Sequence, residues 1–308
     1  MSIKDNLNRV MTQKGLSQKK MAAQVGISNA TLSLYLRGEY SGSIDNVEES
    51  ISNYLAREEE KAKSRTVRIS FVKTRLAKKC LSLIRDSHLD GDIGVLYGSA
   101  GLGKSMVLKH YASTYKDVLL IEADPGYTAK VLLQELCERL GESKRGNIHE
   151  LTENCIKALL AKSATNGSGW LIAIDEAELL PYRALEVLRR IHDRAGVGVV
   201  LAGMPRLLLN LKGRMGEYAQ LYSRVGMAID IDAEKVKTDH DDFGAVLASL
   251  LPEDYECKPA LYSSFHKAAK GNYRRLFKLA RGVVRASEID DQGLSPELVD
   301  EYANMLIH

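Results

Sequence analysis

The sequence is poor in cysteine, and its cysteines do not form the pairs that bind metals or carry out redox chemistry. Only Cys80, Cys137, Cys155 and Cys257 are cysteines among 308 residues, and no two of them stand in a C-x-x-C pattern. This spacing argues against a zinc site and against the disulfide framework of a secreted domain. We expect reduced, mostly buried thiols and a cytoplasmic location.

Long apolar runs and a large excess of one charge are also missing. No stretch approaches the ~20 apolar residues of a membrane-spanning helix, and the polar segment 1–6 lacks the apolar region of a signal peptide. The net charge is only +3, so charge alone does not indicate a nucleic-acid partner. We therefore expect no membrane partner, and the length allows two or three domains.

What is present is a glycine-rich loop between a predicted strand and a predicted helix. Residues 98–105 have the sequence GSAGLGKS, which fits G-x-x-x-x-G-K-[ST], and they follow the apolar run 93–97. Backbone N–H groups of such a loop surround phosphates, and the start of the helix adds positive potential. Lys104 would contact the β- and γ-phosphates, and Ser105 would ligate Mg²⁺. An ordinary strand-to-helix turn is the alternative. We predict that ATP is bound by Gly98, Ser99, Ala100, Gly101, Leu102, Gly103, Lys104, Ser105 and Met106.

An acidic pair follows a second strand pattern. Residues 170–174 (WLIAI) are too few and too β-branched for a core helix, and they end in Asp175 and Glu176. Two carboxylates beside a core are costly unless a cation lies there. In a Walker B arrangement Asp175 holds the Mg²⁺ shell and Glu176 polarises the attacking water. An acidic helix cap is the alternative. With the phosphate loop upstream, the pair predicts binding and hydrolysis of a nucleoside triphosphate.

Residues 1–56 have the pattern of a small helical domain. Ala22 and Val25 lie on one face of a predicted helix, and Gly26 supplies the turn that follows it. Ser28 would cap a second helix in which Leu32 and Leu36 are spaced four apart.

This pattern resembles the helix-turn-helix of Cro- and repressor-like DNA-binding domains. The resemblance implies that the major groove is contacted by Asn29, Ala30, Thr31 and Ser33, with Arg37 near phosphate. A helical hairpin used only for protein contacts is the alternative, because such folds are often recruited for other contacts.

The rest of the chain is predicted as a charged linker over 57–68, an α/β core over 69–235 and a helical domain over 236–308. In the core, helical patterns alternate with predicted strands at 92–97, 118–122, 170–174, 197–202 and 227–231. This alternation predicts a five-stranded parallel sheet covered on both faces. A unit over 118–161 separates the phosphate-loop strand from the Walker B strand, which places the fold with the additional-strand P-loop ATPases.

Charge becomes polarised after the predicted sheet. Residues 228–256 hold nine acidic and two basic side chains, whereas residues 258–287 hold eight basic and no acidic ones. One helical face collects Arg274, Lys278, Arg281 and Arg285. Either a solvated basic face or a phosphate-binding surface accounts for this stripe.

With both Walker motifs placed, the chain resembles the AAA+ ATPases, and more closely the target-DNA activators of Mu-like transposable phages. The resemblance rests on the N-terminal helix-turn-helix, both Walker motifs, segments 71–74, 174–180, 199–203 and 220–225, and the short helical C-terminal domain. It implies an AAA+ P-loop ATPase with a five-stranded parallel sheet, an N-terminal helix-turn-helix domain and a small helical lid.

The family also implies two arginine contacts to nucleotide. An arginine just before the fifth strand reaches the γ-phosphate of a neighbouring subunit, and Arg224 stands at that point; its guanidinium stays charged and binds phosphate as a fork. Arg274 matches the lid arginine that senses nucleotide within its own subunit. One departure is Met204, which stands where the family places a polar residue that positions the water. Methionine cannot donate a hydrogen bond, so we expect slow hydrolysis or a substitute such as Arg206.

The function implied by the resemblance is ATP-dependent, largely sequence-nonspecific binding of duplex DNA by a helical homo-oligomer. Such a filament would deliver target DNA to the phage transposase and activate it. Candidate DNA contacts are Lys130, Lys144 and Arg145 of the core, and Lys278 and Arg281 of the basic stripe. A helicase loader, an insertion-sequence ATPase and a nucleotide-sensing helix-turn-helix regulator are the alternatives.

Overall fold

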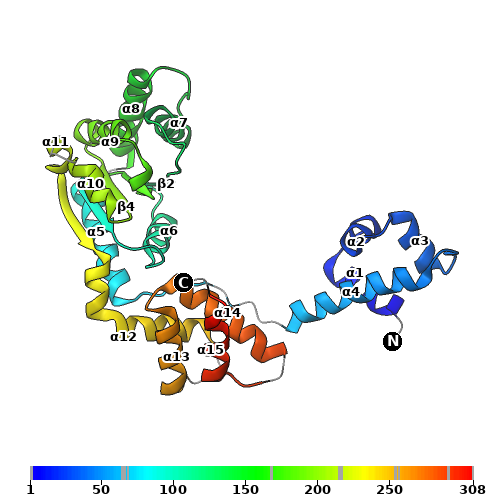
Figure 1. The fold of residues 1–308 in the computed structure, drawn as a ribbon. Helices are drawn as coiled ribbons and strands as arrows, with labels where there is room; N and C mark the ends of the chain where they lie inside the picture. The colour runs from blue at the N-terminus through cyan, green and yellow to red at the C-terminus, as the bar shows by residue number, and fades with distance from the viewer. Residues whose placement is uncertain are drawn as a thin grey trace. The chain divides into compact units, whose positions relative to one another are not determined.

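The computed structural model describes residues 3–63, 67, 69–166, 169–213, 218–252, 255, 257–289 and 292–306. The chain divides into two compact units, Met1–Val67 with Arg281–Ser295, and Arg68–Ala280 with Pro296–His308. Figure 1 shows the helices and strands of the chain and their labels. Among the helices of the described ranges, none is both long and apolar enough to cross a membrane.

The N-terminal segment of the first unit forms α1 (Ile3–Lys14), α2 (Gln18–Val25), α3 (Asn29–Arg37) and α4 (Ile44–Lys63), and residues 281–289 of a later helix also belong to this unit. The apolar faces of α1 to α4 meet in one core, which is formed by Leu7, Met21, Ala22, Leu32, Tyr35, Val47, Ile51 and Tyr54. α2 and α3 are the two predicted helices of the helix-turn-helix. α4 runs through Lys63, so residues 57–63 of the predicted linker are helical, and residues 64–66 and 68 lie outside the described residues.

The turn between α2 and α3 forms as the sequence predicts. Gly26 has a φ of 86°, in the left-handed region, and its N–H donates to the carbonyl oxygen of Ala22. The Ser28 hydroxyl accepts the N–H of Thr31 at 3.0 Å and so caps α3. A glycine at the C-cap and a serine at the N-cap therefore fix the two ends that face the turn.

The second unit is built on a five-stranded parallel sheet, as predicted. The strands are β1 (Ile93–Tyr97), β2 (Val118–Glu122), β3 (Leu171–Asp175), β4 (Gly198–Gly203) and β5 (Val225–Asp230). Their order is β2-β3-β4-β1-β5, and every neighbouring pair is parallel. β3, which ends in Asp175, is therefore separated from the phosphate-loop strand β1 by β4 alone.

Helices cover both faces of this sheet because side chains along each strand alternate in direction. Ile172 and Ile174 belong to a core shared with α7 (Ala129–Leu140), α8 (Ile148–Asn166) and α9 (Tyr182–Ala195). Leu171 and Ala173 point the other way, into a core shared with α5 (Arg75–Asp90) and α6 (Lys104–Thr114). Between β1 and β3 the chain forms α6 and then the additional unit of one strand, β2, and two helices, α7 and α8.

Shorter elements and the lid helices complete this part of the chain. The 3-10 turn η1 (Ala177–Leu179) and the helices α10 (Arg206–Lys212) and α11 (Ala219–Tyr222) flank the sheet. The C-terminal helices are α12 (Ile231–Leu250), α13 (Pro259–Ala269), α14 (Tyr273–Ile289) and α15 (Pro296–Asn304). α12 follows β5 directly and runs through the predicted core–lid boundary at residue 235, and α13 packs against α15.

All four cysteines carry free thiols, as predicted. Cys80, Cys137 and Cys155 are buried and Cys257 is half-buried. Burial raises the pKa of the Cys80 thiol to about 12, which disfavours the reactive thiolate.

A buried carboxylate attaches the lid helix α12 to the core. Asp242 is only 2% exposed, and its two oxygens accept the N–H groups of Arg75 at 2.8 Å and Leu76 at 3.0 Å. These amides begin α5 and have no partner inside the helix, so the carboxylate satisfies donors that would otherwise be buried and unpaired.

We expect Asp242→Ala to lower the free energy of unfolding by about 1–3 kcal/mol, because two buried amides lose their acceptor. Asp241→Ala is the matched control, because that carboxylate is 58% exposed and pairs with the Arg75 side chain at 2.8 Å. Exposed pairs contribute about 1 kcal/mol or less. Urea unfolding of both variants checks this, and equal losses would contradict the anchoring role of Asp242.

Candidate nucleotide-binding site

The phosphate loop connects β1 to α6 in the second unit. Gly101 and Gly103 have φ angles of 81° and 95°, which residues with a Cβ rarely adopt. α6 begins at Lys104, with Gly103 at its N-cap and no side chain capping it. The first N–H groups of α6 are therefore directed toward the loop, where an anion is favoured.

The Lys104 side chain lies across this loop. It is 8% exposed, and its Nζ donates to the carbonyl oxygens of Gly98 at 2.6 Å and Ser99 at 2.9 Å. Burial lowers the pKa of Lys104, while the charges of Glu176, Glu178, Asp175 and Asp232 act in the opposite direction. The ammonium group thus lies between the loop carbonyl oxygens and a group of carboxylates.

Three of these carboxylates, those of Asp175, Glu176 and Glu178, lie at the end of β3. Asp175 is 2% exposed, and its Oδ1 accepts the N–H of Glu176 at 3.0 Å. Glu176 has a φ of 52°, which is uncommon for a residue with a side chain and tends to occur at functional positions. Burial raises the pKa of Glu176, and the neighbouring charges of Glu178 and Asp175 raise it further.

Glu178 is a member of this cluster that sequence reasoning did not single out. Its side chain is buried, and Oε2 has no hydrogen-bond partner among the described residues. A Cβ on Gly203, at the end of β4, would lie 2.2 Å from that oxygen, so a larger residue there would displace the Glu178 carboxylate. Arg206, the predicted substitute for a polar residue at Met204, has Nη2 at 3.9 Å from Glu178 Oε1. The only sequence signal was a third acid within segment 174–180.

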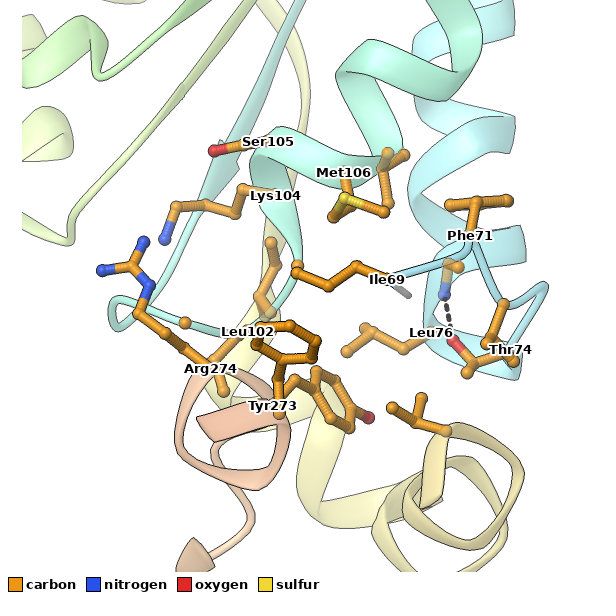
Figure 2. Close-up of a pocket in the computed structure, with 18 of the residues that line it drawn as sticks. Ile69, Phe71, Thr74, Leu76, Leu102, Lys104, Ser105, Met106, Tyr273 and Arg274 are labelled. Carbon is orange, nitrogen blue, oxygen red and sulfur yellow. Dashed lines mark hydrogen bonds between the residues drawn. The ribbon is translucent and has the colours of Figure 1, made fainter. Parts of the chain in front are cut away.

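A mostly apolar cavity of about 270 Å³ lies beside the phosphate loop. Figure 2 shows the side chains of Phe71, Leu76, Leu102, Met106 and Tyr273 around it. An apolar slot next to a phosphate loop suits a flat nucleobase. Segment 71–74 was known only as a family feature. The contribution of Tyr273 had no signal in the sequence, because it depends on where the lid folds.

The lid touches the phosphate loop directly. Asn272 Nδ2 donates to the carbonyl oxygen of Ala100 at 2.7 Å, and the Arg274 N–H donates to that of Gly101 at 3.3 Å. The Arg274 side chain lines the cavity, and Figure 2 shows its charged end on the same side as that of Lys104. Asp232, in the first turn of α12, accepts the N–H of Ser99 at 2.7 Å. The lid and the loop therefore form one site.

Comparisons with known proteins agree with this geometry. An AAA domain model matches residues 88–211, and a helix-turn-helix model matches residues 7–49. The ORC2 protein of Aeropyrum pernix has a similar fold, with a TM-score of 0.57, 17% identity, and coverage of 78% of this chain and 71% of that one. The chain therefore contains an AAA domain, and the fold around it is that of the AAA+ ATPases.

Two curated relatives of this ATPase have names that refer to DNA transposition or to the activation of target DNA. The Mu-like prophage FluMu DNA transposition protein B of Haemophilus influenzae is 28% identical over 243 residues, covering 76% of this chain and 82% of that protein. The ATP-dependent target DNA activator B of Escherichia phage Mu is 27% identical over 237 residues, covering 76% and 74%. The resemblance inferred from the sequence is thus confirmed.

Arg224, Lys130, Lys144 and Arg145, which were also predicted, are not among the residues that line the cavity. Arg224 directly precedes β5, is 53% exposed, and pairs with Asp193 at 3.2 Å. Lys130 and Arg145 are exposed, and Lys144 pairs with Glu138 at 2.9 Å.

The predicted basic stripe of α14 exists as a surface feature, since Lys278, Arg281 and Arg285 are all exposed. In the helix-turn-helix, Asn29 and Arg37 are exposed, and Arg37 pairs with Glu39 at 3.5 Å. Thr31 is half-buried, and its hydroxyl lies 2.8 Å from that of Ser28.

Proposed function

We propose that this ATPase binds double-stranded DNA in an ATP-dependent and largely sequence-independent way, as a helical homo-oligomer that delivers the DNA to a phage transposase and activates it. The observation that carries the proposal is the similarity of three quarters of the chain to a protein named ATP-dependent target DNA activator B. The intact phosphate loop and the acidic end of β3 support its ATP dependence.

The residues in and around the cavity have separate roles in binding and hydrolysing ATP. Lys104 and the amides of the loop bind the phosphates, and the apolar slot near Phe71 and Tyr273 receives the base. Ser105, which lines the cavity, and buried Asp175 form an oxygen donor set that fits Mg²⁺. Mg²⁺ bound there would neutralise charge on the phosphates. Glu176 orients and deprotonates the attacking water, and Arg274 contacts the phosphates from the lid.

Arg224 is proposed to act on the nucleotide of a neighbouring subunit. It does not line the cavity formed by the described residues of its own chain, and half of its surface is exposed. A guanidinium that meets another subunit's γ-phosphate makes hydrolysis depend on assembly.

For DNA, we propose phosphate contacts from the exposed residues Lys130, Lys144, Arg145, Lys278 and Arg281. The helix-turn-helix adds contacts through Asn29, Thr31 and Arg37. Contacts to phosphates position a protein on DNA without recognising sequence, in keeping with a target-DNA binder.

The match to a helix-turn-helix model favours a second candidate, a sequence-specific regulator that uses nucleotide as a signal. Footprinting on a long duplex distinguishes the two functions. One discrete protected site would support the regulator, and uniform protection in ATP would support the filament.

We expect Lys104→Ala to abolish both ATP binding and ATP-dependent DNA binding, because the charge on the β- and γ-phosphates is lost. Electron microscopy of the protein on plasmid DNA, with and without ATP, checks assembly. Lys109→Ala is the control, since this exposed lysine of the same helix pairs with Glu122 at 3.5 Å. Filaments formed by the Lys104 variant would contradict nucleotide control.

Glu176→Gln separates hydrolysis from assembly. The substitution keeps the shape and removes the base, so turnover should fall on the order of a hundredfold, whereas ATP affinity should be retained. DNA-bound assemblies should therefore persist in ATP. Single-turnover hydrolysis and the lifetime of the DNA complex measure the two effects, and rapid disassembly with normal turnover would exclude this role.

The fall of kcat/KM at acidic pH should follow the protonation of Glu176. Its pKa is raised by burial and by neighbouring carboxylates, so the base is lost as the pH falls through this raised value rather than near that of a free glutamate. Glu178→Gln removes one of those charges and should move the acid limb of kcat/KM to lower pH. Glu122→Gln, on an exposed side chain, should leave the profile unchanged. An unmoved limb in Glu178→Gln would argue against coupling of the two carboxyls.

A further inference from the structure

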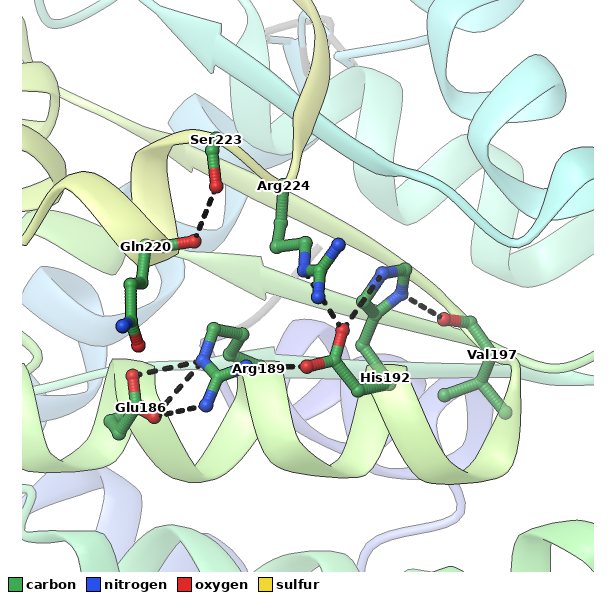
Figure 3. A network of polar contacts seen from close by, with 8 residues as sticks. Glu186, Arg189, His192, Val197, Gln220, Ser223 and Arg224 are labelled. Atoms are coloured by element: carbon green, nitrogen blue, oxygen red, sulfur yellow. Dashed lines mark hydrogen bonds and ion pairs between the residues drawn. The ribbon is translucent and has the colours of Figure 1, made fainter.

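Arg224 lies at one end of a chain of ion pairs on the surface of α9. Its Nε is 3.2 Å from Asp193 Oδ1, and Arg189 donates to the other oxygen of Asp193 (Figure 3). Arg189 in turn binds Glu186 through Nε, at 2.9 Å to Oε1 and 3.0 Å to Oε2. His192 approaches Asp193 Oδ1 at 3.9 Å.

The acidic residues and the arginine of α9 that form these ion pairs are spaced so that they lie on one face of the helix. Glu186, Arg189 and Asp193 stand at positions i, i+3 and i+7 of α9, which lie one above another. α11 packs against α9 through buried Leu221 and delivers Arg224 beside Asp193. The carboxylate is less exposed than the guanidinium it holds, at 26% against 53%.

The geometry of the pair leaves the phosphate-binding part of Arg224 available. A guanidinium has five N–H donors in a planar fork, and Asp193 engages the Nε side. A guanidinium offers more donors than one carboxylate oxygen can accept, so Arg224 can also bind a phosphate as a fork.

The charges also favour release to a phosphate. Because Arg189 compensates much of the charge on Asp193, the attraction between Asp193 and Arg224 is that of a weak, exposed pair. Such a pair restricts a long side chain without binding it tightly.

We propose that Asp193, itself held by Arg189, is a positioning residue that presents the Arg224 guanidinium to the nucleotide of an adjoining copy of this chain. This inference rests on the proposed role of Arg224 as a finger that acts between subunits. Asp193 makes no contact with nucleotide and acts only through Arg224. Asp193 would limit the orientations of the Arg224 guanidinium before the subunits assemble. A side chain that is already oriented makes a more efficient contact in the transition state.

The test compares DNA-stimulated ATPase activity of the full-length variants Asp193→Ala, Asp193→Asn and Arg224→Ala. We expect Arg224→Ala to lower kcat by roughly a thousandfold or more, and Asp193→Ala by about tenfold. Asp193→Asn, which retains an acceptor for Nε, should lose less. The affinity of the isolated subunit for ATP should stay unchanged in all three, and adding Asp193→Ala to Arg224→Ala should cause no further loss.

Glu153→Ala, on the neighbouring helix α8, is the matched control. Glu153 pairs with Arg190 at 3.3 Å and with Arg194, two other arginines of α9, and these pairs do not include Arg224. Its activity should remain normal. An equal loss in Glu153→Ala would show that any perturbed ion pair of α9 lowers activity, and would overturn the inference.

Mixed assemblies give a measurement that a structural defect would not change. Glu176→Gln subunits have an intact finger and should still bind ATP, so they can present Arg224 to the intact loop of an Asp193→Ala subunit. Activity per Asp193→Ala subunit should then rise several-fold. No rise, with co-assembly shown, would place the defect in the subunit's own site and overturn the inference.

Normal activity of Asp193→Ala beside an inactive Arg224→Ala would also overturn the inference about Asp193, but not the proposed role of Arg224. Normal activity of Arg224→Ala would overturn the finger itself.

Discussion

The site depends on one electrostatic arrangement, a buried ammonium group facing buried carboxylates across the edge of a parallel sheet. Lys104 is almost fully removed from water, and such a charge is costly unless it is compensated. Two loop carbonyls and the acidic end of β3 supply the compensation. The sheet makes this possible because its strands are parallel, so the carboxyl ends of β1 and β3 lie at the same edge. An anion that binds the loop therefore meets a site in which the positive charge of Lys104 already faces negative carboxylates.

The lid is tied to this arrangement at two levels. Asp242 fixes α12 to the first amides of α5, far along the chain, through hydrogen bonds that are buried. Asn272 and the amide of Arg274 contact the loop itself, where glycines allow the backbone to change. The first contact holds the lid in place, and the second makes the position of α14 depend on the conformation of the loop. The N-terminal end of the basic helix α14 therefore contacts the phosphate loop directly.

Much of this organisation was predictable from local patterns. The strand positions followed from short β-branched runs, and the turn of the helix-turn-helix followed from Gly26 and Ser28, which act on their own neighbours. The phosphate loop and the Asp175–Glu176 pair were predictable because their chemistry requires particular residues at fixed spacing. Glu178 and Asp193 were not predicted, because a single acid in a charged segment has no distinctive local pattern. Their partners, Gly203 and Arg224, are distant in sequence.

The sequence by itself determined the order of the elements, the glycines with left-handed backbone, the caps, and the residues able to bind phosphate and polarise water. These features depend on interactions within a few residues, so they are encoded where they occur. Only the tertiary structure decided that Phe71 and Tyr273 share a cavity with the loop, that Asp242 anchors α12, and that Arg224 pairs with Asp193 and does not line the cavity. Those outcomes are set by the packing of helices against a twisted sheet, which brings together side chains that no local pattern relates.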